Sequence, residues 1–337
     1  MKLSQIGEFG LIERLRTQLA TRAGVQLGIG DDCAVLDSLQ TPILTMDALV
    51  EGVHFRRDWT SPRALGRKAM AVNVSDLAAS GARPVAALVS LALGPDDDVA
   101  WVEQLYAGFE DAAREFDFTL VGGDTVKSRG DLMMSVALVG EVLNPNRGPI
   151  LRSGAQIGDV ILVSGSLGDS AAGLALLQAP ETPVSDAARE FLLLRHHEPT
   201  PRLEIMRALL EIDASAVHAA LDLSDGLVGD GAHMAQSSDV SLHLDADLLP
   251  ISSFGFEAAL ALEKSARDWA LSGGEDYELL LALAPQRAQL LAKEVKKRCG
   301  VKLSPIGKCV APDENRPRVV VRENGVEVPT TRAWTHF

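Results

Sequence analysis

Residues 69–79 have the sequence Ala-Met-Ala-Val-Asn-Val-Ser-Asp-Leu-Ala-Ala, which is apolar on almost every side of a helix, with a single acid, Asp76. The segment lies in a longer helix that we predict from Ser61 to Gly81, with serine at the N-cap, proline in the first turn and glycine at the C-terminal end. A helix that is apolar nearly all round is buried. We therefore expect Asp76 in the interior, where its carboxylate needs a partner.

Strands and helices alternate on both sides of this helix. In the first half the patterns predict helices over 8–19 and 99–115 and strands at 42–47, 85–93, 118–121 and 132–142. A linker at 144–149 leads to a strand at 159–164, helices over 169–178, 186–195 and 202–210, a strand at 216–223, another helix, a last strand at 278–284, a helix over 286–299 and a terminal hairpin. Mixed elements in two halves predict an α+β fold with two domains, 1–148 and 149–337.

Composition narrows the class of protein. The chain has 337 residues, of which 47% are hydrophobic and 23% charged, and this suits a globular protein with two cores. A formal net charge of −14 opposes binding to nucleic acid, which needs clustered basic residues. An acidic protein still binds anionic phosphates if its acids first hold divalent cations.

The sequence contains no evident membrane-spanning segment, signal peptide or cysteine motif. No apolar run approaches the roughly 20 residues that span a bilayer, and residues 1–8 lack the apolar core of a signal peptide, so we expect no membrane association and a cytoplasmic protein. The three cysteines, Cys33, Cys299 and Cys309, are widely spaced, which argues against a disulfide framework and a thiolate zinc site.

Acids follow short apolar runs at several places, and each is expected at the end of a buried strand: Asp31-Asp32, Asp47, Asp124 and Asp222. For one such acid alone, a helix cap or an Asx turn is the commoner role. Together with Asp76 they favour a divalent cation, because burying unpaired carboxylates is costly. Oxygen-only ligands select hard ions, Mg²⁺ first and structural Ca²⁺ as the rival, although no EF-hand loop is present.

Neither a Walker loop nor a dinucleotide fingerprint occurs in the sequence. In Val121-Gly122-Gly123-Asp124-Thr125, two glycines would let backbone N–H groups approach a phosphate beside an acid. Arg152, just past the linker, would lie on one wall of an inter-domain cleft, or else is a solvated surface residue. Segment 272–278, Ser-Gly-Gly-Glu-Asp-Tyr-Glu, suits a cationic or hydroxyl-bearing substrate, or else is a tight turn with surface acids.

The motifs taken together resemble the thiamine-monophosphate kinase family over essentially the whole chain. They occur in the family's order, at Gly7–Phe9, Gly28–Ala34, Asp47–Phe55, Ala71–Ala82, Gly122–Thr125, Gly168–Leu174, Asp222–Leu227, Ser272–Leu279 and His336–Phe337. The resemblance implies the fold of the aminoimidazole-ribonucleotide synthetase superfamily, with a homodimer whose N-terminal sheets join into a barrel. It also implies direct in-line transfer of a phosphoryl group from ATP to thiamine phosphate, with several Mg²⁺ ions.

The resemblance further implies roles for individual residues. The magnesium ligands would be Asp32, Thr45, Asp47, Asp76, Asp124, Asp222 and Asp225. The ATP contacts would be Tyr106, Gly123, Asp124, Arg152 and Ser224, with Asp124 and Arg152 catalytic. The contacts to thiamine phosphate would be His54, Glu275 and Trp334. Met46 departs from the family, which tends to have threonine there, so any ligand from this position would be its backbone carbonyl.

Two kinds of alternative remain open. Sibling enzymes of the same superfamily also use ATP, among them selenophosphate synthetase and a carbamoyl-dehydrating hydrogenase maturation protein. The former needs a reactive cysteine or selenocysteine near the N-terminus, and the first cysteine here, Cys33, lies inside the acidic loop. The other alternative is a non-catalytic module that binds Ca²⁺ or a nucleotide.

Overall fold

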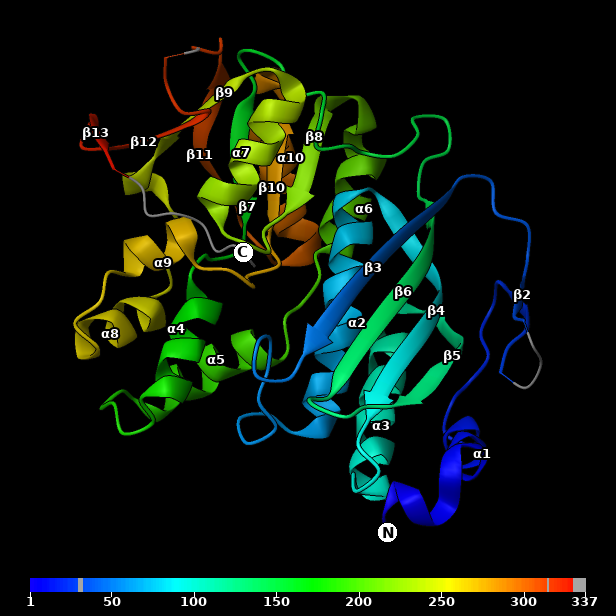
Figure 1. Ribbon diagram of the computed structural model, residues 1–337. Helices are drawn as coiled ribbons and strands as arrows, with labels where there is room; N and C mark the ends of the chain where they lie inside the picture. Colours follow the sequence, from blue (N-terminus) through cyan, green and yellow to red (C-terminus); the bar gives the residue numbers. More distant parts are fainter. Residues whose placement is uncertain (30–32, 314, 330–337) are drawn as a thin grey trace. The chain divides into compact units, whose positions relative to one another are not determined.

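The computed structural model describes residues 1–29, 33–313 and 315–329 (Figure 1). The chain divides into two compact units, one made of Met1–Leu77 and Ala82–Val142 and the other of Ala78–Gly81 and Leu143–Phe337. The mixed α+β character with two units confirms the predicted fold class. The exact domain limits, 1–148 and 149–337, stay a prediction. Within the described residues, no helix is both long and apolar enough to cross a membrane.

The first unit contains a four-stranded sheet. Its strand order is β3 (Pro42–Val50), β6 (Met133–Val142), β4 (Ala82–Leu93) and β5 (Thr119–Lys127). Strands β4 and β5 are parallel, and the other two pairs are antiparallel. The helices are α1 (Leu3–Arg16), α2 (Pro62–Ala79) and α3 (Val99–Phe116), and a short ribbon joins β1 (Val25–Leu27) to β2 (Val35–Leu36). In the part of the chain that the structure describes, this sheet is open and forms no closed barrel.

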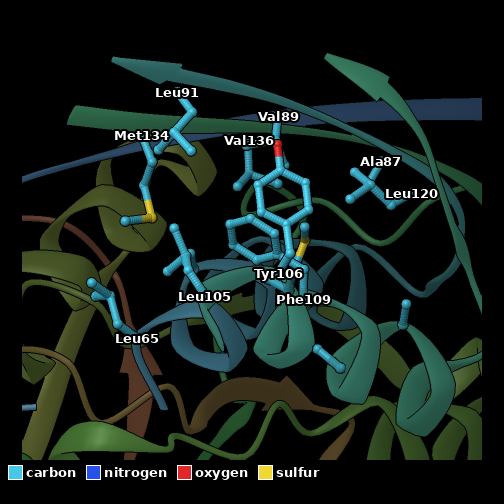
Figure 2. Close-up of a cluster of buried hydrophobic side chains, with 14 of the residues drawn as sticks. Leu65, Ala87, Val89, Leu91, Leu105, Tyr106, Phe109, Leu120, Met134 and Val136 are labelled. Atoms are coloured by element: carbon cyan, nitrogen blue, oxygen red, sulfur yellow. The ribbon is translucent and has the colours of Figure 1, made fainter. Parts of the chain in front are cut away.

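Helices α2 and α3 cover one face of this sheet. Side chains alternate between faces along a strand, so Ala87, Val89 and Leu91 of β4 all point toward the helices. Figure 2 shows them packed over Leu105 and Phe109 of α3. The opposite face carries large apolar side chains that are exposed: Leu44, Met46, Leu88, Val126 and Met133.

Two glycines allow helices α2 and α3 to pack at a short distance from each other. A Cβ on Gly66 of α2 would lie 2.1 Å from the carbonyl oxygen of Leu105, and a Cβ on Gly108 of α3 would lie 2.0 Å from that of Arg63. No larger residue fits at either position without moving a helix backbone. The predicted limits of α2 are confirmed, and this crossing holds α2 against the core, with Asp76 close to its C-terminal end.

The second unit is built on a seven-stranded sheet. Its order is β13 (Val326–Val328), β12 (Val319–Glu323), β9 (Ser241–Asp245), β11 (Leu303–Val310), β7 (Val160–Ser164), β10 (Leu279–Leu283) and β8 (Val217–Asp222). Helix α7 (Leu227–Ser238) packs on one face, and α6 (Leu203–Asp213) and α10 (Pro285–Cys299) pack on the other. A smaller cluster joins α4 (Asp169–Gln178), α5 (Asp186–His197), α8 (Ser253–Ala261) and α9 (Ala266–Ser272).

Some predicted elements are wrong in extent or number. Segment 278–284 is not the last strand before the terminal hairpin, because β11 follows it, and β9, α8 and α9 were not predicted at all. Strand β11 contains Pro305 and Gly307 at a shift of register, and both residue types weaken the sequence pattern of a strand. Helix α1 begins at Leu3 and ends at Arg16, whereas the prediction placed it over 8–19.

Candidate functional site

Thr45, Asp47 and Asp76 come together in the first unit. The Thr45 hydroxyl donates a hydrogen bond to Oδ2 of Asp76, which joins strand β3 to helix α2. Asn73, one turn before Asp76, accepts a hydrogen bond from the backbone N–H of Asp47 at 3.1 Å and donates one to the carbonyl of Ala69 at 3.1 Å. These bonds between the sheet and the helix fix the carboxylate of Asp76 and the main chain of Asp47.

Electrostatics at this pair favour a bound cation. Burial, and to a smaller extent the neighbouring charge of Asp76, raise the pKa of Asp47 to about 6. A divalent cation would relieve both effects, and oxygen ligands suit Mg²⁺.

The predicted positions of these two acids are partly wrong. Asp47 does not end its strand as predicted, because β3 continues to Val50. Asp76 is half-buried at the helix surface that meets the sheet, less buried than the sequence predicted.

Asp124 lies inside β5 and not at its end, so its predicted place after the strand is wrong. The strand runs on to Lys127, and Asp124 is exposed opposite Ser90 of β4. The strand register places Asp47 in line with Val89 and Gly123, and Val89 points to the face that the helices cover. Asp124 is the next residue along β5, so its side chain points to the other face. The carboxylates of Asp47 and Asp124 therefore lie on opposite faces of the sheet. A Cβ on Gly123 would lie 1.9 Å from the Val89 carbonyl oxygen, so this glycine is needed for the close approach of two strands.

Tyr106 is buried in the core of the first unit, edge-on to Phe109 with ring centroids 4.9 Å apart. Its hydroxyl points to the sheet, as Figure 2 shows, and is hydrogen-bonded to the side chain of Thr125. Burial raises the pKa of this phenol to about 12. The bond fixes the residue that follows Asp124, while a nucleotide contact from Tyr106 itself stays a prediction.

In the second unit, Asp222 ends strand β8 as predicted, and Ser224 and Asp225 follow in a turn. The carboxylate of Asp230, in the first turn of α7, accepts hydrogen bonds from the N–H groups of Ser224, Asp225 and Gly226 at 3.0, 3.0 and 3.1 Å. Asp230 is buried, and burial raises its pKa to about 6 despite these bonds. Sequence reasoning missed this residue, although an acid in the first turn of a helix is a known signal for N–H groups nearby.

Segment 272–278 lies against the same turn. The N–H of Glu275 donates to the carbonyl of Ser224 at 2.7 Å, so these two predicted contact residues are neighbours. Glu278 is fully buried and accepts from Arg195 and Arg202, and Asp276 is also buried. The alternative of a turn with surface acids is therefore wrong for both.

Arg152 lies beside β8, the edge strand of the second sheet. The carbonyl of Leu151 accepts a hydrogen bond from the N–H of Ala220 at 3.1 Å, and the carbonyl of Arg152 accepts one from Oγ of Ser238 at 3.2 Å. The guanidinium is exposed and has no ion-pair partner among the residues that the structure describes. A free guanidinium suits an anionic ligand.

The remaining predicted residues divide into two groups. His54 is tied to the end of β3, because its Nδ1 accepts from the N–H of Val50 at 3.1 Å. Asp32 and Trp334 lie outside the described residues. Within residues 1–29, 33–313 and 315–329, no three His, Cys, Asp or Glu side chains form a cluster that could hold a metal ion. Of the predicted metal ligands, the structure brings Thr45, Asp47 and Asp76 together in the first unit, while Asp222 and Asp225 lie at the end of β8 and in the turn that follows it.

Comparisons with known proteins agree with this picture. Residues 30–142 match the model of the AIR synthase related protein, N-terminal domain, and residues 156–320 that of the AIR synthase related protein, C-terminal domain. The thiamine-monophosphate kinase of Escherichia coli O157:H7 is 44% identical over 277 residues, which cover 81% of each chain.

Two solved structures extend the match to nearly the full length. The thiamine-monophosphate kinase of Stenotrophomonas maltophilia K279a is 37% identical, with a TM-score of 0.79 over 95% of this chain and 97% of the other. AaThiL complexed with AMPPCP and TMP is 35% identical, with a TM-score of 0.74 over 100% of this chain and 99% of the other. The motif order, the two-unit α+β fold and these matches together place the chain in the thiamine-monophosphate kinase family.

Proposed function

We propose that this chain phosphorylates thiamine phosphate with ATP, giving thiamine diphosphate and ADP. Family membership carries the proposal, and the relative complexed with AMPPCP and TMP supports both substrates. An oxygen of the thiamine phosphate attacks the γ-phosphorus of ATP, and the bond between that phosphorus and the bridging oxygen of ADP breaks. The acceptor is already an anion, so no strong general base is needed.

Magnesium ions belong to this proposal. The predicted ligands are Asp32, Thr45, Asp47, Asp76, Asp124, Asp222 and Asp225. The donor set fits, since it contains only oxygen atoms, and the raised pKa of Asp47 marks a buried carboxylate beside a second acid, Asp76. When bound, the ions neutralise the phosphates of two anionic substrates. Because Asp47 and Asp124 lie on opposite faces of one sheet, they would hold different ions.

The chain's own residues supply positioning and charge. The exposed guanidinium of Arg152 binds phosphate oxygens of ATP and balances charge that develops during transfer. Gly123 and Ser224 are further proposed contacts to the nucleotide. Glu275, beside Ser224, contacts thiamine phosphate, whose thiazolium ring is a cation. His54 and Trp334 complete the proposed substrate contacts, and Tyr106 holds Thr125 next to Asp124.

A homodimer is part of the proposal because the first sheet leaves an apolar face uncovered. Leu44 and Met46 of β3 are 74% and 67% exposed, and the register places Met46 in one row with Leu88 of β4. A contiguous apolar face of this kind is typical of an interface. Two copies of the sheet, packed face to face, would bury it and form a barrel.

The test is product formation by the purified protein with ATP, Mg²⁺ and either thiamine phosphate or free thiamine. We expect ADP and thiamine diphosphate from thiamine phosphate and no diphosphate from free thiamine. With ATP made chiral at the γ-phosphorus, a single in-line transfer inverts the configuration, whereas a phospho-enzyme would retain it. No product from either acceptor, with ATP still bound, would contradict the activity and favour a sibling reaction.

A further inference from the structure

The backbone around Glu275 is held in an uncommon conformation. Glu275 and Tyr277 have φ values of +65° and +50°, in the left-handed region that residues other than glycine rarely adopt. Hydrogen bonds hold both residues in place, because their N–H groups donate to the carbonyls of Ser224 and Leu223 at 2.7 and 2.9 Å. Such strain persists only where the surroundings fix it, and it gathers at functional sites.

Asp276, between these two residues, anchors the segment to helix α4. Its buried carboxylate accepts hydrogen bonds from the N–H groups of Gly168 at 2.7 Å and Ser170 at 3.3 Å, at the helix N-terminus where a negative charge is favoured. The main chain of Glu275 is therefore fixed on both sides.

The side chain of Glu275 lies beside His196, which is in the last turn of α5. Nδ1 of His196 is 3.4 Å from Oε2 of Glu275 and 3.1 Å from Oγ of Ser170. A carboxylate oxygen accepts hydrogen bonds, so donation from His196 to Glu275 requires the tautomer with the proton on Nδ1. The His196 side chain is 7% exposed and that of Glu275 is 26% exposed, so the histidine supports the carboxylate from the interior.

His196 reaches this place because α4 and α5 pack closely at Gly173. A Cβ on Gly173 would lie 2.2 Å from the carbonyl oxygen of Leu192 and 3.0 Å from Cβ of His196. The preceding residue, Arg195, donates to Glu278. The end of α5 thus supplies two neighbouring donors to two acids of one segment, and only Glu275 of these acids reaches solvent.

We infer that His196 is a positioning residue that holds the Glu275 carboxylate toward the cationic part of thiamine phosphate. The inference rests on the proposed function and deepens it. His196 acts through Glu275 and touches no substrate itself. Its removal therefore weakens binding of thiamine phosphate and leaves binding of ATP unchanged.

The experiment compares steady-state kinetics of His196→Ala, His196→Asn, Glu275→Gln and the double variant His196→Ala/Glu275→Gln. We expect His196→Ala to raise KM for thiamine phosphate on the order of tenfold, with KM for ATP unchanged. Asparagine places an amide N–H near the position of Nδ1, so His196→Asn should restore most of the affinity. In the Glu275→Gln background the alanine change should add little, because the two residues act as one unit.

Leu176→Ala is the control for packing. Leu176 is fully buried in the same α4–α5 cluster and makes no part of the Glu275 contact, so this variant should lower Tm without changing KM for thiamine phosphate. Additive effects in the double variant, an equal rise in both KM values, or a KM change in Leu176→Ala would overturn the inference. Should His196→Ala not fold, His196→Phe takes its place, because it keeps a ring at this position but has no N–H donor. It should raise KM for thiamine phosphate in the same way and add little in the Glu275→Gln background. Absence of turnover in the unaltered protein would contradict the proposed function instead.

Discussion

The hydroxyl of Thr45 on β3 donates a hydrogen bond to the carboxylate of Asp76 on α2. Strand β3 is an edge strand, and this bond and that between Asp47 and Asn73 tie it to the helix layer. The same bonds bring two acids together at a place where burial disfavours the charged form of Asp47. The free-energy cost of placing two acids side by side in a partly buried position is offset when a cation is bound.

Asp76→Asn should abolish phosphoryl transfer and leave the fold intact. The amide still accepts the hydrogen bond from Thr45 but carries no charge, so kcat should fall by roughly a hundredfold or more. Calorimetry should show Tm unchanged or slightly raised, because one of two like charges is lost. Asp131→Asn, at an exposed acid of the same unit, is the control and should keep full activity. Unimpaired transfer by Asp76→Asn would remove this residue from the metal site.

Gly66→Ala should destabilise the first unit. Its new Cβ would lie 2.1 Å from the Leu105 carbonyl oxygen, so α2 must move away from α3, which we expect to cost about 1–3 kcal/mol. Urea unfolding measures the loss. Gly130→Ala is a matched control, since a Cβ there has nothing within 4 Å. Equal stability of the two variants would show that the crossing tolerates a side chain.

The limits of α2, the extent of α4 and the place of Asp222 could be predicted because local signals determine them. Serine, proline and glycine mark the ends of α2, and an apolar run stops at Asp222. The pair Gly122-Gly123 favoured a loop, yet both residues lie inside β5. Gly123 is needed because the Val89 carbonyl is close, and a contact between strands distant in sequence leaves no local pattern.

The supporting residues of the site could not be predicted for a similar reason. Asp230 and Asp276 look like ordinary acids in the sequence, and only the fold shows that each accepts hydrogen bonds from backbone N–H groups of another segment. His196 lies about 80 positions before Glu275, and their contact depends on how α4 and α5 pack. Motifs marked the residues proposed to contact ligands, while tertiary packing determined which residues hold them.

The open sheet face should control the oligomeric state. Replacing Leu44 and Met46 together by aspartate should give a folded monomer, because burying two charges in the proposed interface is costly. Light scattering after size-exclusion chromatography measures the mass. Ile157→Asp, at another exposed apolar residue in the second unit, should leave the mass unchanged. A dimer that persists in the double variant would place the interface elsewhere.

The buried carboxyl of Asp276 should make the stability of the protein depend on pH. Complete burial raises its pKa from 3.8 to about 7, mainly because the charged form loses its hydration. A group whose pKa is raised by folding stabilises the native state below its unfolded pKa, and this contribution is lost as the pH rises from about 4 to about 7. The variant Asp276→Asn tests this, because its amide does not titrate.

The difference to be measured is the free energy of unfolding of Asp276→Asn minus that of the unaltered protein. It should rise between about pH 4 and about pH 7 by an amount on the order of a few kcal/mol and stay level above about pH 7. Urea unfolding of both proteins at several pH values between 4 and 8 measures the difference, in which the titration of all other groups cancels. A constant difference would mean that Asp276 stays charged throughout, held by the N–H groups of Gly168 and Ser170 and by Arg195.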